Sequence, residues 1–273
     1  MSILKETYEL DNGVKIPKIA IGTWQVSNSV VLNSVGVSLK NGYTHIDTAS
    51  AYQNEIGVGK AVRNSGIPRN ELFITTKVPA EIKNYEEAVA IIKKSLENLD
   101  MDYMDLLLIH APKPWQEMFG GTEKTYFEEN IAVWTAMEEA YKSGKIKAIG
   151  VSNFDVADLK NIMDNCEVKP MANQIRFFIG NTQDEITSFC QKNNILVEGY
   201  SPIATGNLLK SGIISEIANK YGKTIPQICI RYILQRGALP LPKSTHEKYI
   251  TENANVDFEI SKEDMKYLDS QKK

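Results

Sequence analysis

The feature that most constrains the fold is a regular alternation of short apolar segments with stretches of helical periodicity. Several apolar segments contain almost no polar residue, as in Leu106-Leu107-Leu108-Ile109, which is typical of parallel strands covered on both faces. Parallel neighbours need long crossover connections, and helices supply them. Eight segments have the composition of such strands, at residues 19–23, 44–47, 72–76, 104–109, 146–151, 171–175, 195–199 and 238–241.

The intervening stretches have recognisable helix ends. The pairs with capping-box spacing are Asn84 with Glu87, Thr182 with Glu185, and Thr224 with Gln227. Gly144 is placed to end a helix in the left-handed region. Apolar residues recur at helical spacing and are assigned to core packing, at Val89, Ile92, Leu96 and Leu99, at Val133, Trp134, Met137, Ala140 and Tyr141, and at Ile225, Ile228, Cys229, Tyr232 and Ile233.

A chain of strand-helix units fits either a doubly wound sheet or a (β/α)8 barrel. The doubly wound sheet usually carries a glycine-rich phosphate turn after its first strand, whereas here the first strand runs into Gly22-Thr23-Trp24-Gln25. A barrel of this type typically has about 250 residues, and the chain has 273. We therefore expect one (β/α)8 TIM-barrel domain over residues 1–273.

Two segments near the ends of the barrel sequence carry further signals. Residues 8–16 are expected to form a β-hairpin, because Asn12 and Gly13 tolerate positive φ at both turn positions. Pro240 and Pro242 flank Leu241 in the last strand segment. Because proline removes a ladder donor, we expect that strand to be very short.

Composition argues against several classes of function. The net charge of −3 gives no basic surface for nucleic acid or for an anionic membrane. The three cysteines, Cys166, Cys190 and Cys229, have neither metal-site nor redox spacing, which is typical of a reducing compartment. The N-terminus lacks a signal-peptide core, and no apolar run approaches the roughly 18 residues of a membrane helix. We expect a cytoplasmic protein without nucleic-acid or membrane partners.

The C-terminal ends of barrel strands carry the active site in enzymes of this fold, so the polar groups there are the candidates. Tyr52 stands in a loop of small residues five positions after Asp47. Loops that converge on one mouth would bring an acid, an ammonium, a phenol and an imidazole together. The polar or aromatic groups at seven consecutive strand ends are Asp47, Lys77, His110, Ser152 with Asn153, Gln174, Tyr200 with Ser201, and Lys243 with Ser244.

This set suits proton donation to a carbonyl oxygen. A phenol has a pKa near ~10, and a neighbouring ammonium lowers that pKa, so Lys77 is expected to tune Tyr52. Asp47 would keep Lys77 charged, and His110 would hydrogen-bond a substrate oxygen. We expect no metal site, because the histidines are scattered: His45 is assigned to the core and His246 to a solvated helix start. These residues do not supply a reductant.

The sequence resembles the aldo-keto reductases, and is most similar to the short prokaryotic members related to 2,5-diketo-gluconate reductases. The motifs that carry the resemblance span nearly the whole chain in the order found in the family. They are residues 42–49 (GYTHIDTA) with Tyr52, 75–77 (TTK), 105–110 (DLLLIH), 150–154 (GVSNF), 173–174 (NQ), 200–202 (YSP), 241–244 (LPKS) and 252–253 (EN).

The resemblance implies a barrel whose lower end is closed by the N-terminal hairpin, and NADPH-dependent reduction of aldehydes or ketones to alcohols by hydride transfer. Tyr52 would donate the proton, Lys77 and Asp47 would tune it, and His110 would orient the carbonyl. The implied cofactor contacts are Gly22, Thr23, Trp24 and Asp47 at the first strands, Ser152, Asn153 and Gln174 at the carboxamide, Tyr200 on the nicotinamide ring, Ser201, Ile203 and Leu208 at the pyrophosphate, Lys243, Ser244 and Thr245 at the 2′-phosphate, and Tyr249, Glu252 and Asn253 near the adenine.

Some positions depart from the family pattern. Tyr249 stands where the family often has arginine, so the preference for NADPH is expected to be weaker and NADH use possible. Arg176 lies in the segment that replaces the usual acid after Gln174, and Ala111 replaces a bulky aromatic. Residues 112–130 are interpreted as a substrate loop, with ordinary surface as the alternative. The substrate pocket is expected to contain Trp24, Tyr52, His110 and Trp115, and the short segment after Leu268 implies an open pocket with broad carbonyl acceptance.

The expected function is that of a carbonyl reductase that acts on a small aldehyde or ketone, as a monomer or weak dimer. Two other functions are possible for a chain of this kind. Some relatives bind nicotinamide cofactors as regulatory subunits of membrane channels with little turnover, and they typically carry additional segments. A phosphosugar isomerase would require a glycine-rich phosphate loop and a glutamate base at a strand end, for which Lys243-Ser244 is only a partial match.

Overall fold

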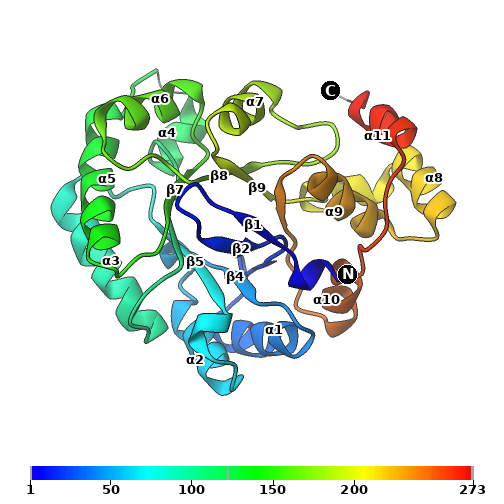
Figure 1. Ribbon diagram of the computed structural model, residues 1–273, viewed down its shortest axis with the longest axis horizontal. Helices are drawn as coiled ribbons and strands as arrows, with labels where there is room; N and C mark the ends of the chain where they lie inside the picture. The colour runs from blue at the N-terminus through cyan, green and yellow to red at the C-terminus, as the bar shows by residue number, and fades with distance from the viewer. Residues whose placement is uncertain (1, 122, 272–273) are drawn as a thin grey trace.

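The predicted strands form one parallel sheet in the computed structural model, which describes residues 2–121 and 123–271 (Figure 1). Neighbouring strands pair in chain order from the first to the last. The strands are β3 (Ile21–Gly22), β4 (His45–Asp47), β5 (Phe73–Val78), β6 (Leu106–Ile109), β7 (Ile149–Ser152), β8 (Ala172–Arg176), β9 (Leu196–Tyr200) and β10 (Leu239–Leu241). Together with the surrounding helices they form the expected (β/α)8 barrel.

The barrel closes between its first and last strands. The Ala20 N–H donates to the Pro240 carbonyl at 3.3 Å, and the Gly22 N–H donates to the Pro242 carbonyl at 2.9 Å. A proline lacks the N–H but keeps its carbonyl, so both prolines are tolerated as acceptors at this position. The prediction of a very short last strand is confirmed, because β10 has three residues.

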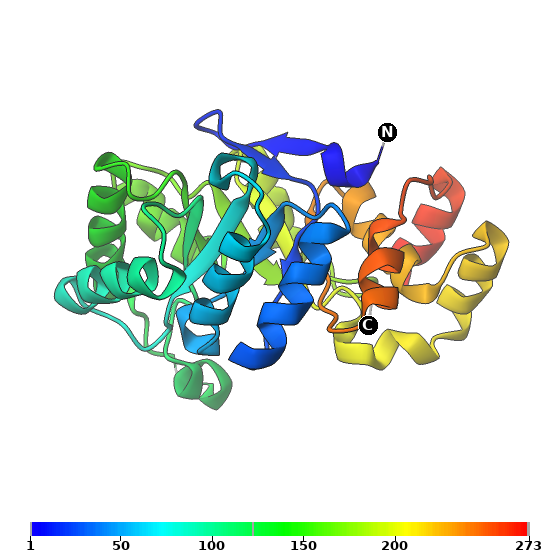
Figure 2. The ribbon, with the colours of Figure 1, turned by 90° about the horizontal axis from the view of Figure 1, so that it is seen from below.

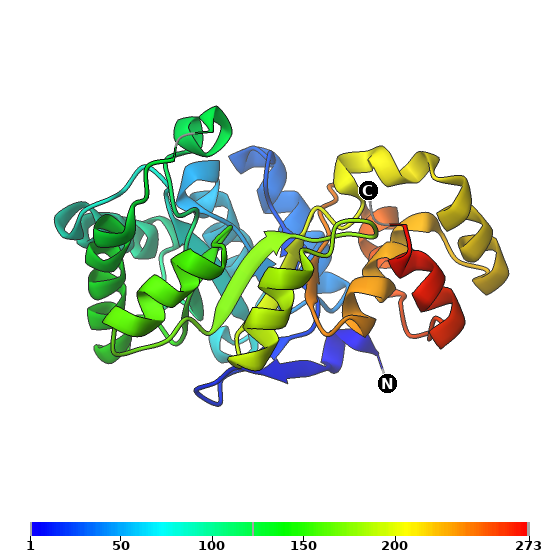
Figure 3. The ribbon, with the colours of Figure 1, turned by 90° about the horizontal axis from the view of Figure 1, so that it is seen from above.

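The N-terminal hairpin lies across the end of the barrel opposite to α4 (Trp115–Gly120), as Figures 2 and 3 show. It consists of β1 (Thr7–Glu9) and β2 (Lys15–Pro17), paired antiparallel. Ile16 is fully buried and packs in one cluster with Phe73 and Leu106, which begin two barrel strands. The hairpin therefore plugs the N-terminal ends of the strands, as expected.

The turn of this hairpin differs from the prediction. Gly13 has the expected positive φ of 81°, but Asn12 does not share it, and residues 10–14 connect the two strands. The Asn12 side chain accepts from the Val14 N–H at 3.2 Å and donates to the Lys147 carbonyl at 2.9 Å. The connection is thus longer than a two-residue turn, and Asn12 joins it to the barrel.

The barrel helices alternate with the strands, and none of those in the described residues is long and apolar enough to cross a membrane. Short 3-10 turns are η1 (Ile3–Lys5), η2 (Ser50–Tyr52), η3 (Arg69–Glu71) and η4 (Ala204–Lys210). The α-helices are α1 (Asn28–Lys40), α2 (Glu55–Asn64), α3 (Tyr85–Leu99), α4, α5 (Phe127–Lys142), α6 (Val156–Asn165), α7 (Asp184–Lys192), α8 (Gly212–Tyr221), α9 (Ile225–Gln235), α10 (Glu247–Ala254) and α11 (Lys262–Asp269).

Two of the three predicted capping pairs are confirmed. The Asn84 side chain accepts from the Glu87 N–H at 2.9 Å, and Thr224 with Gln227 forms a reciprocal capping box. The predicted pair of Thr182 and Glu185 is wrong. The backbone before α7 turns through Gln183, which has φ 45°, and the Thr182 hydroxyl instead donates to the Asp184 carboxylate at 2.6 Å.

The predicted apolar helix faces are largely buried, with one exception. Val89 is 42% exposed, because the buried face of α3 runs through Ala88, Ile92 and Leu99. Gly144 follows α5 with φ 77°, as predicted. The placement of Val89 was wrong because an apolar residue one position off the stripe still satisfies a loose helical spacing.

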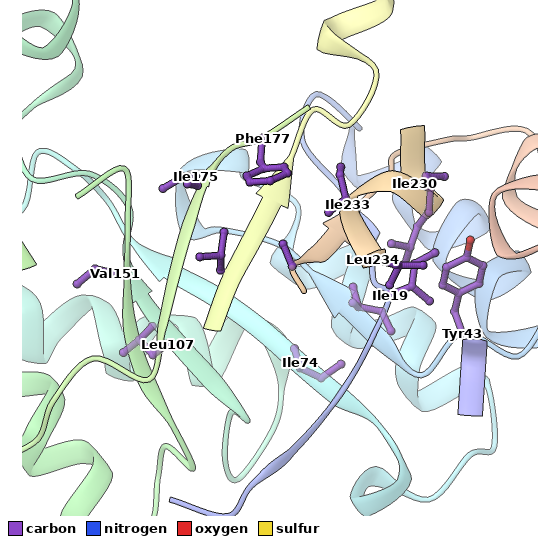
Figure 4. Close-up of a cluster of buried hydrophobic side chains, with 14 of the residues drawn as sticks. Ile19, Tyr43, Ile74, Leu107, Val151, Ile175, Phe177, Ile230, Ile233 and Leu234 are labelled. Carbon is purple, nitrogen blue, oxygen red and sulfur yellow. The ribbon is translucent and has the colours of Figure 1, made fainter. Parts of the chain in front are cut away.

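The core forms two layers that follow the alternation of side chains along a strand. In β6, Leu106 and Leu108 point into the barrel, whereas Leu107 and Ile109 pack outward against the helices. Figure 4 shows this outer layer, in which Leu107 and other strand residues form one cluster with Ile233 of α9. Every strand is therefore covered on both faces, which explains its nearly continuous apolar sequence.

Helix α2 depends on glycines where it meets its neighbours. A Cβ added at Gly57 would lie 2.5 Å from the Asn28 carbonyl oxygen in α1, and one added at Gly59 would lie 2.1 Å from the Leu99 carbonyl oxygen at the end of α3. Neither contact involves the far end of a flexible side chain. The two glycines therefore set how closely α2 approaches α1 and α3, directly after the loop that carries Tyr52.

We expect Gly59→Ala to lower the free energy of unfolding by about 1–3 kcal/mol, because the added methyl overpacks a backbone contact. The matched control is Gly36→Ala in α1, where a Cβ would meet nothing within 4 Å, and it should raise the free energy of unfolding by about 0.5–1 kcal/mol. Urea unfolding of both variants measures the difference. Equal stabilities would show that α2 shifts freely and that the close approach is not required.

Candidate active site

An ion pair occupies the centre of the barrel mouth. Asp47 ends β4, and Lys77 projects from the neighbouring strand β5. The Lys77 Nζ lies 2.8 Å from both carboxylate oxygens of Asp47 and donates to the Thr48 carbonyl at 2.7 Å. The two side chains are almost fully buried, so each charge is satisfied by protein groups rather than by water.

Tyr52 and His110 meet at this pair, as the sequence predicts. The Tyr52 ring centre lies 5.2 Å from the Lys77 Nζ, and the His110 ring packs edge-on to Tyr52 with a centroid distance of 5.5 Å. Tyr52 comes from η2 after β4, whereas His110 directly follows β6. Three separate segments therefore bring the acid, ammonium, phenol and imidazole into one site.

Burial and the ion pair set the protonation states of this site. Burial alone would lower the pKa of Lys77, but the Asp47 carboxylate, with smaller contributions from Tyr52 and Glu198, raises the pKa above its usual range. Burial raises the pKa of the Tyr52 phenol, and Lys77 lowers it by less. Lys77 thus lowers the pKa of Tyr52, as predicted, but burial, which spacing in a sequence does not reveal, makes the net direction upward. The phenol keeps its proton at neutral pH.

His110 is neutral in this environment. Burial lowers the pKa of its imidazole to about 3, and the Lys77 ammonium acts in the same direction. Its Nδ1 is buried without a hydrogen-bond partner among the described residues. A neutral imidazole carries one N–H, so His110 can donate one hydrogen bond to a ligand oxygen without adding a charge.

A buried amide extends the ion pair across the mouth. The Gln174 Nε2 donates to the Asp47 Oδ2 at 2.9 Å and to the Glu198 Oε2 at 2.8 Å. Glu198 is fully buried in the middle of β9. Glu198 is not among the site residues predicted from the sequence. Its signal was present, because Glu198 is the only charged residue in the apolar segment 195–199.

Three further candidates form one wall of the mouth. The Ser152 hydroxyl donates to the Gln174 carbonyl at 2.8 Å. Asn153 has φ 61°, and its amide donates to the His110 carbonyl at 3.0 Å, while its Oδ1 accepts from the Tyr200 hydroxyl at 2.7 Å. The ends of β7, β8 and β9 are therefore linked directly to the catalytic candidates.

The candidates at the first strand lie on another side of the mouth. Gly22 ends β3, and the Thr23 hydroxyl donates to the Asp47 carbonyl at 3.0 Å. Trp24 follows with 46% of its surface exposed. The aromatic wall continues on α4, because the Trp115 ring packs edge-on to His110 at 5.2 Å and stacks on Phe119 at 5.8 Å.

The phosphate and adenine candidates lie on the segments after β9 and β10. Ser201 has φ 54°, and Ile203 and Leu208 lie at η4, which packs against α9 as α10 does. The Ser244 hydroxyl accepts from the His246 N–H at 3.1 Å in the turn before α10. The remaining candidates follow in the same region, with Lys243 and Tyr249 exposed, Thr245 and Glu252 half-buried, and Asn253 buried.

The residues at the mouth fit a ligand that donates hydrogen bonds. Both N–H groups of the Gln174 amide are used, whereas its Oε1 accepts no hydrogen bond from the described part of the chain. The Asn153 Oδ1 has one donor, Tyr200, and a second lone pair. The carboxamide of a nicotinamide dinucleotide supplies N–H donors of this kind, so the residues fit that cofactor.

The remaining histidines and the three cysteines lie outside the active site. The His45 Nε2 lies 2.9 Å from the Thr75 Oγ1 in the core, and His246 is exposed, as expected. Cys190 and Cys229 are buried, and Cys166 is partly buried. Over residues 2–121 and 123–271, no three His, Cys, Asp or Glu side chains gather in a way that suits a metal ion.

Comparison with known proteins gives consistent matches over nearly the whole chain. A sequence model described as "Aldo/keto reductase family" matches residues 18–273. Glyoxal reductase of Bacillus subtilis is 43% identical over 98% of this chain and 93% of its own length. Methylglyoxal reductase DkgA of Escherichia coli K12 is 36% identical over 94% of this chain and 90% of its own length.

Solved structures agree with the sequence comparisons. An aldo-keto reductase from a Medee basin deep-sea metagenome library has a TM-score of 0.91 at 37% identity and covers 97% of this chain and 95% of its own. The Bombyx mori aldo-keto reductase in complex with NADP has a TM-score of 0.87 at 31% identity, with 98% and 92% covered. With a family match over residues 18–273 and relatives above 30% identity, this chain belongs to the aldo/keto reductase family.

Proposed function

We propose that this chain reduces a small aldehyde or ketone to the alcohol, with Tyr52 as the proton donor. The chain belongs to the aldo/keto reductase family, its relatives are named as reductases of glyoxal, methylglyoxal and other aldehydes, and two similar solved structures hold NADP or NADPH. The observation that carries the role of Tyr52 is the buried ammonium of Lys77, 5.2 Å from the phenol ring and held by Asp47. The relatives' names make 2-oxoaldehydes the first substrates to test.

Tyr52, Lys77 and His110 would each have a different role in the reaction. A bound nicotinamide cofactor would supply the hydride for the carbonyl carbon. Tyr52 keeps its proton until the carbonyl oxygen gains negative charge and then transfers it, while the Lys77 ammonium stabilises the phenolate that remains. Neutral His110 would donate a hydrogen bond to the same oxygen and so fix the direction of the carbonyl.

We infer that Ser152, Asn153 and Gln174 hold the carboxamide and that Tyr200 lies on the ring. Support comes from the free acceptor on Gln174 and from the hydrogen bond that joins Asn153 to Tyr200. The 2′-phosphate end would be held by the side chains around α10. The remaining proposed contacts are Gly22, Thr23, Trp24, Asp47, Ser201, Ile203, Leu208, Lys243, Ser244, Thr245, Tyr249, Glu252 and Asn253 for the cofactor, and Trp24 and Trp115 for the substrate.

We further infer that residues 1–273 act as one barrel unit, as a cytoplasmic monomer or weak dimer without nucleic-acid partners. The net charge of −3 supports the last point, because a net negative charge does not favour binding to nucleic acid. Use of NADH beside NADPH belongs to the same proposal and rests on Tyr249. The regulatory alternative has no support among the relatives, which are named as enzymes.

Replacing Tyr52 with phenylalanine should lower kcat for methylglyoxal reduction about 10²–10⁴-fold, because the general acid is lost while the ring remains. NADPH affinity, measured by quenching of protein fluorescence, should stay within about twofold. Tyr267→Phe, in exposed α11, is the matched control and should leave both quantities unchanged. A Tyr52→Phe enzyme with normal turnover would rule out the assigned acid.

The pH profile tests the assigned protonation states. His110, with its pKa lowered to about 3, stays neutral above pH 4, and the raised pKa of Tyr52 keeps the phenol protonated up to alkaline pH. We therefore expect no decline in kcat/KM between pH 8 and about pH 5 that is due to His110. An acid limb near pH 6–7 that disappears in His110→Gln would contradict a neutral imidazole.

Tyr249→Arg should lower the dissociation constant of NADPH relative to that of NADH by about tenfold. This is the effect expected of one charge-assisted hydrogen bond to the 2′-phosphate. Tyr249 is half exposed beside His246, with ring centroids 5.9 Å apart, so an arginine has room there. Tyr249→Phe keeps the ring and is expected to leave the ratio unchanged. If the arginine does not change the ratio of the two dissociation constants, the 2′-phosphate lies elsewhere.

A further inference from the structure

A fully buried carboxyl group lies inside the barrel beside the mouth. Glu198 stands opposite Gln174 of β8 on one side and Leu239 of β10 on the other. Its Oε2 accepts from the Gln174 amide, and its Oε1 has no partner among the described residues. Burying a carboxyl group in this way is costly, and the reaction described above does not use it.

The two acceptors that face Gln174 determine how its amide is turned. An amide nitrogen carries two hydrogens, and here one goes to Asp47 and the other to Glu198. Turning the amide over would place its oxygen against two carboxyl groups. The oxygen is therefore directed away from both, and it accepts no hydrogen bond from the described residues.

Asp47 alone does not fix this orientation. Its Oδ1 binds Lys77, and its Oδ2 is shared between Lys77 and Gln174. Without Glu198, the second amide hydrogen would be buried without a partner, which is unfavourable, so the amide would turn that hydrogen toward the mouth. A donor would then stand where the carboxamide of the cofactor needs an acceptor.

We propose that Glu198 is a positioning residue for the cofactor, because it holds the Gln174 amide with its oxygen free to accept from the nicotinamide carboxamide. The inference rests on the proposed use of a nicotinamide cofactor. It assigns to Glu198 an effect on binding at the nicotinamide end only, and none at the adenine and 2′-phosphate end.

Glu198 can orient the Gln174 amide whether its carboxyl group is charged or neutral. Burial and, to a smaller extent, the Asp47 carboxylate raise the pKa of Glu198 to about 7, although the Gln174 hydrogen bond and Lys77 act in the opposite direction. Asp47 on β4 and Lys77 on β5 are the charged groups that act on it. When Glu198 is neutral, the proton can reside on the unpartnered Oε1, and Oε2 still accepts from Gln174.

The test measures dissociation constants for two ligands by fluorescence quenching. NADPH contains the nicotinamide, whereas adenosine 2′,5′-bisphosphate contains only the adenine and 2′-phosphate end. Glu198→Leu removes the acceptor but fills the space, and it should weaken NADPH about tenfold while leaving the bisphosphate within about twofold. Glu198→Gln keeps an acceptor oxygen and should bind NADPH within about twofold of the wild type.

A double-mutant cycle separates positioning from a general structural effect. In a Gln174→Ala background, Glu198→Leu should cause no further loss of NADPH affinity, because the amide through which it acts is gone. Binding of the bisphosphate shows which variants are folded. If Glu198→Leu is not folded, Glu198→Met is tested in its place.

The outcomes distinguish the inference from the function on which it rests. Wild-type affinity for NADPH in the leucine or methionine variant, or an equal loss in the Gln174→Ala background, would overturn the role of Glu198. A wild-type chain that binds neither NADPH nor the bisphosphate would overturn the proposed cofactor itself. An equal loss for both ligands would show that Glu198 supports the barrel rather than the amide.

Discussion

The site depends on one buried ion pair, between Lys77 and Asp47. An ammonium inside a barrel loses its hydration, and this cost is offset only if its three donors find good acceptors. Both carboxylate oxygens of Asp47 and the Thr48 carbonyl supply them. The same carboxylate accepts from Gln174, so the ion pair that keeps Lys77 charged beside the phenol also anchors the amide at the opposite side of the mouth.

The two ends of the proposed cofactor site are built in different ways. Around Gln174 and Asn153, buried and partly buried hydrogen bonds orient both side-chain amides. At and just before α10, by contrast, Lys243 and Tyr249 are exposed. Hydrogen bonds thus define the geometry of the reacting end, whereas exposed side chains at the other end can be replaced without altering that geometry.

Much of this architecture is predictable from the sequence because strand composition and helix caps are local signals. The eight strands, the N-terminal hairpin, and the caps at Asn84 and Thr224 follow from such signals, whereas the position of the hairpin at the end of the barrel was implied by the family resemblance. The start of α7 does not, because the left-handed backbone at Gln183 depends on the tertiary path of the loop. The direction of the Tyr52 pKa also escapes the sequence, since it depends on how completely the phenol is desolvated. Glu198 was visible as a charge in an apolar segment, but its partner on β8 is 24 residues away.

The joint between β3 and β10 has a consequence for the whole barrel. Both hydrogen bonds there run from Ala20 and Gly22 to proline carbonyls, and the prolines have no N–H to return. In the described residues, β3 and its flanking residue Ala20 therefore donate both hydrogen bonds of this joint, and the segment around β10 only accepts. The loops that carry Trp24 and Lys243 follow β3 and β10 on the two sides of the joint. A dinucleotide that contacts both loops would hold the first and last strands together. Cofactor binding would then stabilise the barrel that carries the active site.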